Sequence, residues 1–162
     1  MVDPREEKVL WTLDGLWRRQ HDATLLPGGR LLVFDNLHDR TPGSERSRVV
    51  EVDPATQQVR WRYPPEPRDP ARPLLRTVAG MARRLPNGNT LIVESTEGRA
   101  LEVTPGHETV WEFHSPFRAG RNDELVAILF GLERIGAETP LPFLSAGNPP
   151  AGEGGLRPAP AR

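Results

Sequence analysis

The sequence has no cysteine, and Lys8 is the only lysine among its 21 basic residues. Without cysteine there is no disulfide bond, no thiolate metal ligand and no cysteine nucleophile. The 21 basic side chains are balanced by 22 acidic ones, giving a formal net charge of -1. Such a balance, with the arginines scattered, provides no field that would gather nucleic acid or an anionic membrane. We therefore expect no nucleic-acid partner.

Long apolar runs are also absent. No stretch approaches the roughly 20 apolar residues of a membrane-spanning helix. The first residues, Met1 to Lys8, are charged and lack the apolar core of a signal peptide. The sequence therefore predicts no membrane segment and carries no recognisable export signal, and it leaves the cellular location undetermined.

The four histidines do not occur at the short spacings of a metal site. Three of them, His38, His107 and His114, lie in loops or turn-like segments. The sequence also lacks a glycine-rich phosphate-binding loop and a nucleophile elbow. We therefore predict no metal ion and no cofactor.

Three tryptophans at equal spacing reveal an internal repeat. Trp11, Trp61 and Trp111 are 50 residues apart, and each ends a short β-like run. Between them, Leu-Pro-Gly-Gly at 26–29 returns as Leu-Pro-Asn-Gly at 85–88. Glycine-containing turns of this kind join the two strands of a hairpin. Each repeat is therefore expected to contain a first hairpin at this point.

A second hairpin precedes each of the later tryptophans. Residues 48–54 and 99–105 alternate in strand fashion and end in a proline that begins a turn. Each repeat thus contains four short strands. The expected strands are 21–26, 31–35, 49–53 and 58–63 in the first repeat, and 81–85, 90–95, 99–104 and 109–113 in the second.

Four antiparallel strands in a repeat of this length are typical of a β-propeller blade. The fold expected is all-β, a partial propeller of two four-stranded blades, 21–63 and 80–113, with part of a third that includes a leading strand at 8–13. Two consecutive meanders of a β-sandwich are the alternative, although sandwiches seldom repeat so closely in sequence. Because propellers close with typically 4 to 8 blades, two blades would need missing blades or a homo-oligomeric partner. A reading frame that begins inside a longer protein is the favoured explanation.

The propeller domain is expected to span 1–135. Its last apolar run, Asp123 to Phe130, suits either a strand of a third blade or a short closing helix. Residues 136–162 are rich in proline, glycine and alanine, which is typical of a flexible tail.

The repeat separates scaffold from candidate site residues. A residue type present at equivalent positions of both blades serves the blade itself, as with Glu51 and Glu102. His21 breaks the repeat, because its expected counterpart is Gly80. The first strand of a propeller blade lines the central channel. An imidazole there suits a nucleophile or a general acid and base, with Asp22 or a backbone carbonyl fixing its tautomer. Alternatively, His21 caps the strand or hydrogen-bonds a neighbouring blade.

Three further residues are candidate substrate ligands. Arg83 and Arg84 stand where the first blade has threonine and leucine, and a guanidinium suits a sulfate or phosphate oxyanion. Asn36 follows Asp35 at the end of the second strand. The alternatives are a solvated surface position for each arginine and a turn for Asp35 and Asn36.

These segments resemble the C-terminal blades of arylsulfotransferase-type propellers over about residues 8–135. The resemblance is carried by Gln-His-Asp-Ala at 20–23, Leu-Leu-Val-Phe-Asp-Asn at 31–36, Val-Val-Glu-Val-Asp-Pro at 49–54 and Arg-Leu-Pro-Asn-Gly-Asn-Thr-Leu-Ile-Val-Glu-Ser at 84–95. It implies a six-bladed propeller. It also implies transfer of a sulfuryl group from a phenolic sulfate ester to a phenol, through a sulfated channel histidine and without a nucleotide sulfate donor. The position carried over is His21. The family resemblance further suggests a periplasmic or exported protein.

Three hypotheses of function stay open. The first is an arylsulfate sulfotransferase that is complete only when the other blades are supplied. The second is a noncatalytic propeller that binds a ligand or a partner protein, since a fold does not imply an activity. The third is a decayed fragment without a function.

Overall fold

In the computed structural model of the chain, residues 1–36, 47–65, 79–136 and 138–142 are described. His38 lies outside these residues, as does most of the proposed tail. The chain divides into two compact units, Met1–Leu132 and Glu133–Arg162, and every strand found in the described residues lies in the first. Among the described residues, no helix has the length and apolarity needed to span a membrane.

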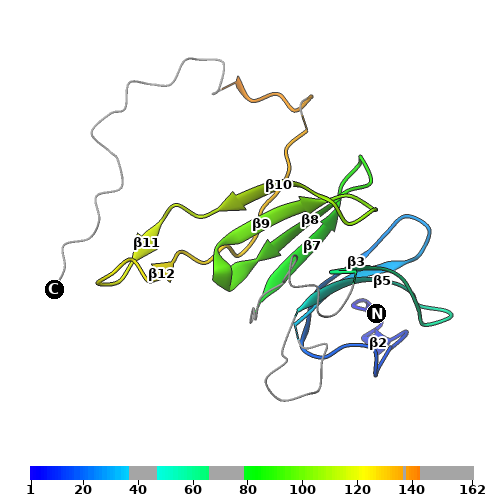
Figure 1. Ribbon diagram of the computed structural model, residues 1–162. Coiled ribbons are helices and arrows are strands. Elements are labelled where there is room, and N and C mark those ends of the chain that lie inside the picture. Colours follow the sequence, from blue (N-terminus) through cyan, green and yellow to red (C-terminus); the bar gives the residue numbers. More distant parts are fainter. Residues whose placement is uncertain (37–46, 66–78, 137, 143–162) are drawn as a thin grey trace. The chain divides into compact units, whose positions relative to one another are not determined.

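Two four-stranded antiparallel sheets form the body of the first unit (Figure 1). In each sheet, neighbours in the sequence are also neighbours in the sheet. The first blade consists of β3 (Gln20–Leu25), β4 (Leu31–Asp35), β5 (Arg48–Asp53) and β6 (Gln58–Tyr63). The second blade consists of β7 (Gly80–Arg84), β8 (Thr90–Glu94), β9 (Arg99–Val103) and β10 (Thr109–His114). This arrangement confirms the predicted all-β fold with two meandering antiparallel blades.

The repeat is visible in the hydrogen bonds of the first hairpin. The amide of Leu26 bonds to the carbonyl of Arg30 at 2.7 Å, and the amide of Leu85 bonds to that of Asn89 at 2.8 Å. Gly88 has a φ of 86° in this turn, a conformation that glycine adopts without the steric cost of a side chain. The two blades therefore share the same first turn.

The repeat extends to an irregularity in the last strand. Trp61 lies opposite Glu51, and Trp111 lies opposite Glu102. Immediately before each tryptophan the register shifts by one residue, so both outer hairpins contain a β-bulge at the same place. The bulge is therefore a structural feature that the two blades share.

A third copy of the outer hairpin lies at the N-terminus. Here β1 (Val2–Asp3) pairs with β2 (Lys8–Val9). Its turn places Glu7 at a φ of 52°, as the other two turns place Gln57 at 59° and His107 at 71°. β2 covers two residues of the predicted leading strand 8–13, and the amides of the next two residues both bond to the Met1 carbonyl.

The chain after β10 forms a small separate hairpin. In it, β11 (Arg118–Ala119) pairs with β12 (Leu125–Val126). The apolar run 123–130 is thus neither a full blade strand nor a helix. Its backbone bonds elsewhere, since the Leu129 amide donates to the carbonyl of Ser95, at the start of the 3₁₀ turn η1 (Ser95–Glu97).

The core lies between the two blades. The side of each blade that carries its tryptophan is called the Trp face, and the other side the opposite face. The Trp face of the first blade packs on the opposite face of the second, and β7 contacts both β3 and β4. The buried residues of this core are Leu26, Leu32, Phe34, Val49, Tyr63, Ala82, Ile92, Leu101 and Val103.

Polar contacts fix the same junction. The Trp61 indole Nε1 donates to the carbonyl of Pro105 at 3.0 Å. Arg84 pairs with Glu51 at 2.5 Å, and its guanidinium carbon lies 5.2 Å from the centre of the Trp61 ring. A cation over an indole ring is attracted by the negative face of the ring. The tryptophan thus anchors one blade to the next.

Candidate functional site

His21 lies on β3, the first strand of the first blade, directly opposite Phe34 on β4. Its side chain is exposed, and the structure assigns it no hydrogen bond with the described residues. It therefore neither caps the strand nor ties this blade to the next within this part of the chain. The imidazole is accessible to a ligand.

A bulge follows His21 and determines where the next carboxylate points. The pairing of β3 with β4 shifts between His21 and Thr24, and Asp22 has a φ of 53°. The Asp22 carboxylate then accepts a bond of 3.0 Å from the Ala82 amide on β7 and pairs with Arg83. Asp22 therefore joins the two blades, and its carboxylate is engaged with β7 rather than with the imidazole.

The bulge also changes the counterpart of His21. Met81 lies opposite Val93 as His21 lies opposite Phe34. By strand register the counterpart is therefore Met81 and not Gly80, because the bulge adds one residue to β3. Packing explains why position 80 is a glycine, since a Cβ there would lie 2.3 Å from Cζ of Phe34.

Arg83 lies beside this bulge. Besides Asp22, its Nη1 contacts the hydroxyl of Thr24 at 2.9 Å. The first strands of both blades thus contribute to a polar group made of Asp22, Thr24 and Arg83, with His21 next to it in the chain. Arg83 and His21 were predicted from the sequence as site residues, whereas Thr24 was not. Only knowledge of the bulge would have placed that hydroxyl near the guanidinium.

The other two candidate ligands are largely buried. Arg84 points into the junction between the blades, where it pairs with Glu51, and both side chains are largely buried. Asn36 is buried as well, and the Ser47 hydroxyl lies 3.4 Å from its side-chain oxygen. Both side chains are therefore held in largely buried contacts, whereas His21 is exposed.

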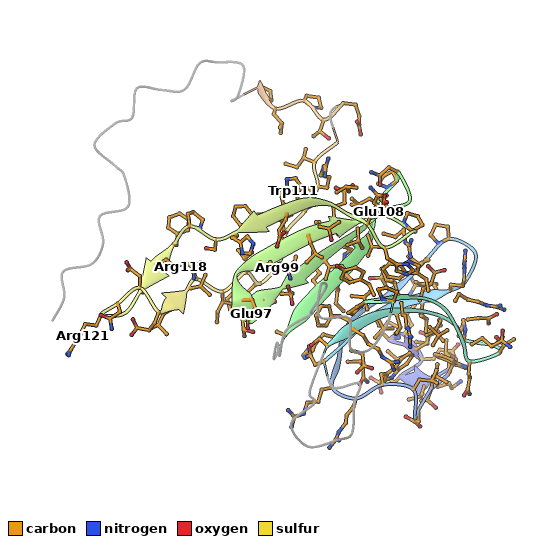
Figure 2. All side chains as sticks on the ribbon, viewed as in Figure 1. Glu97, Arg99, Glu108, Trp111, Arg118 and Arg121 are labelled. Carbon is orange, nitrogen blue, oxygen red and sulfur yellow. The ribbon has the colours of Figure 1, made fainter. Side chains whose placement is uncertain are left out.

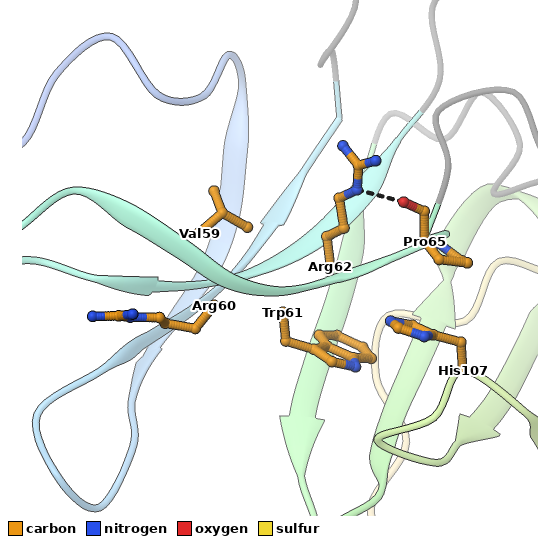
Figure 3. Close-up of a pocket in the computed structure, with 6 residues that line it drawn as sticks. All are labelled: Val59, Arg60, Trp61, Arg62, Pro65 and His107. Carbon is orange, nitrogen blue, oxygen red and sulfur yellow. Dashed lines mark hydrogen bonds between the residues drawn. The ribbon is translucent and has the colours of Figure 1, made fainter.

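Sequence reasoning missed a groove at the outer edge of the blade junction (Figure 3). Its cavity volume is about 390 Å³. Trp61 and His107 stack in it with ring centres 5.6 Å apart and planes inclined by 8°. The signal in the sequence was weak, because His107 merely replaces Gln57 in a repeated turn. The groove is lined by Val59, Arg60, Trp61, Arg62, Pro65 and His107.

A charged network lies in the second blade. Arg99 bridges the carboxylates of Glu94 at 2.7 Å and Glu112 at 2.5 Å, and His114 lies 3.0 Å from Glu112. The hydrogen bond from Arg99 holds the pKa of Glu112 below its ordinary value, against a smaller opposing effect of burial. Across the described ranges, no group of three or more histidine or acidic side chains is placed to hold a metal ion. The network is an ion-pair cluster within the second blade.

A comparison with models of known families identifies the family of this chain. Residues 1–116 match the family model described as arylsulfotransferase (ASST). No curated protein and no solved structure matches the chain significantly. The matched region contains the N-terminal hairpin, both blades and all four candidate residues. Since the match covers well over half of the sequence, the chain belongs to the arylsulfotransferase family.

Proposed function

We propose that this chain contributes to the transfer of a sulfuryl group between phenolic esters, with His21 as the nucleophile. The family supports an arylsulfotransferase-like function in general terms. The observation that carries the finer assignment is the position of His21. It is an exposed imidazole on the first strand of a blade, one residue before the group of Asp22, Thr24 and Arg83.

The chemistry requires two displacements. In the first, a neutral imidazole nitrogen of His21 attacks sulfur, the bond from sulfur to the phenolic oxygen breaks, and the phenolate leaves with the electron pair and takes a proton from solvent. In the second, the oxygen of an acceptor phenol loses its proton to solvent and attacks sulfur. The bond from sulfur to nitrogen then breaks, and neutral imidazole is restored.

Arg83 is the residue we propose for binding the sulfuryl oxygens. Its guanidinium carries a permanent charge and five N–H donors. Those on Nη1 are engaged by Asp22, Thr24 and the Ala82 carbonyl. Asp22 holds the guanidinium of Arg83 near the first strands. The guanidinium is therefore already in place to stabilise the negative charge that develops on the sulfuryl oxygens in the transition state. Asn36 and Arg84 are left out of this proposal, because both are buried in contacts that maintain the blades.

An assay of the purified full chain with a nitrophenyl sulfate and a phenol acceptor tests this function. His21→Ala is expected to remove the transferase activity. His107→Ala is the matched control, since it removes an imidazole from the outer groove and should leave transfer unchanged. Activity that survives in His21→Ala would contradict the assignment of His21.

The second candidate function is noncatalytic binding, and the outer groove favours it. Stacked Trp61 and His107 beside Arg60 and Arg62 offer an aromatic and cationic surface that could hold a ligand. This alternative predicts no sulfuryl transfer by the chain. It also predicts that Trp61→Ala weakens ligand binding, whereas His21→Ala leaves it unchanged.

A further inference from the structure

The outer groove is formed where β6 of the first blade meets the turn that precedes β10 in the second blade. Trp61 comes from β6 and His107 from this turn, and their ring planes are inclined by 8° with centres 5.6 Å apart. The carbonyl of Pro105, in the same turn, accepts a bond of 3.0 Å from the Trp61 indole. Two rings from different blades therefore form one aromatic surface, which is called the ring pair.

A β-bulge places a guanidinium beside the ring pair. The neighbours of Arg60 in β6, Val59 and Trp61, pair with consecutive residues of β5, so Arg60 itself has no place in the register. Because the bulge interrupts the alternation of the strand, Arg60 and Trp61 extend on the same side of β6. Figure 3 shows both on this side, with Val59 and Arg62 on the other. The groove thus combines an aromatic surface with a cation.

The guanidinium of Arg60 is only partly engaged within the chain. Its Nη2 lies 3.3 Å from the Asp53 carboxylate, and the two side chains are 47% and 25% exposed. Exposed ion pairs of this kind are weak, because water and salt screen them. The structure gives Nε and Nη1 of Arg60 no hydrogen bond with the residues it describes. These donors are therefore available to an anion in the groove.

Contacts within the chain fix both walls of the groove. On one side, Nε of Arg62 donates to the Pro65 carbonyl at 2.5 Å (Figure 3). On the other, His107 has a φ of 71° and its amide donates to the Thr104 carbonyl at 2.9 Å. A site whose groups are held in place before binding loses less conformational freedom when a ligand arrives. The groove is therefore preorganised.

The internal repeat shows that a blade does not require these side chains. The bulge residue of the second blade is Val110, in the place that Arg60 takes in the first. The turn of the first blade that corresponds to the turn of His107 has Gln57 at the same left-handed position, with a φ of 59°. A tryptophan follows the bulge in both blades. The tryptophan therefore belongs to the shared scaffold, whereas the cation and the imidazole are specific to this groove.

We propose that the outer groove binds a small aromatic carboxylate, whose ring stacks on the ring pair and whose carboxylate pairs with Arg60. Offset stacking of rings is favourable, and the fork of a guanidinium matches the two oxygens of a carboxylate. Val59 and Pro65 also line the groove and add apolar surface. The cavity volume of about 390 Å³ suits a small-molecule ligand. This proposal names a ligand for the second candidate function and rests on it, and it does not depend on sulfuryl transfer.

An NMR titration of the isotope-labelled full chain with 2-naphthoate tests the ligand class. The indole N–H signal of Trp61 is expected to shift more than those of Trp17 and Trp111. Naphthalene-2-carboxamide keeps the rings and the shape but lacks the charge, so its Kd is expected to be about tenfold higher. Equal affinities for the two compounds, or a larger shift at another tryptophan, would overturn the proposal. An unchanged Trp61 signal at millimolar 2-naphthoate would overturn it as well.

Two variants test the residues of the groove. Arg60→Gln removes the cation and is expected to raise the Kd of 2-naphthoate about tenfold. His107→Gln removes the imidazole while giving the turn the residue type found at position 57, and it should raise the Kd about twofold to tenfold. The matched control is Arg118→Gln, because Arg118 is exposed on β11 and does not line the groove (Figure 2). If Arg60→Gln retains the wild-type Kd and circular dichroism spectrum, the proposal is wrong.

The His21→Ala variant separates this proposal from the proposed transferase activity. It should bind 2-naphthoate with the wild-type Kd, whether or not it transfers sulfuryl groups. Arg60→Gln should conversely keep the sulfuryl transfer of the wild type. A folded His21→Ala chain that no longer binds 2-naphthoate would show that the probe occupies the region of His21 and not the groove.

Discussion

Individual residues show most clearly how the blades are held together. Gly80 is required because the ring of Phe34 fills the space of a side chain, with Cζ 2.3 Å from the position of a Cβ. Gly80→Ala is therefore expected to lower the free energy of unfolding by about 1–3 kcal/mol, as overpacked cores do. Gly106→Ala is the control, since a Cβ there meets no atom closer than 3.7 Å. Equal denaturant midpoints for the two variants would contradict this packing.

Arg84 gives a second prediction at this scale. Arg84→Met removes a charged hydrogen bond to the nearly buried Glu51 and the cation over Trp61. A loss of about 1–3 kcal/mol in the free energy of unfolding is expected from chemical denaturation. Arg60→Met removes the exposed pair with Asp53, and a surface ion pair contributes less to stability than a buried one because water and salt screen it. A larger effect at Arg60 than at Arg84 would refute the role of Arg84 in the junction.

Single strands and hairpins were largely predictable from the sequence. Two four-stranded antiparallel sheets were predicted and are found, because hairpins depend on local turn residues and on alternation along the strand. The bulge after His21 was not predictable, because it depends on Asp22 meeting the Ala82 amide of another blade. In the candidate site, too, local features could be predicted and contacts between blades could not. His21 could be found by comparing repeats, whereas the contact of Arg83 with Thr24 needs the packing of two blades.

The outer hairpin of the second blade gives a prediction about pH. The pKa of Glu112 is lowered mainly by the hydrogen bond from Arg99. A carboxylate with a lowered pKa in the folded state adds stability above its ordinary pKa of 4.5 and loses it as the pH falls through the lowered value. Glu112→Gln should therefore cost stability near neutral pH and show a shallower loss of stability in acid. Thermal unfolding of both proteins from pH 7 to pH 3 measures this. Parallel curves for the two proteins would show that the ion pair contributes nothing to folding.

At the scale of the whole molecule, the two blades pack on each other through a defined pair of faces. The tryptophan of one blade receives the opposite face of the next, and the first strands approach each other at the junction. This geometry brings His21 and Arg83 from different blades to the same region of the chain. A propeller places such first strands around its central channel, so the proposed activity depends on blades assembled around these residues.

The most direct test of the account is mass spectrometry of the full chain after incubation with a nitrophenyl sulfate in the absence of an acceptor. The account predicts a sulfuryl group on the peptide that contains His21, and its loss when a phenol is added. His107 and His114 should remain unmodified under the same conditions. An active protein whose His21 carries no sulfuryl group, or a group found on another residue, would contradict the account.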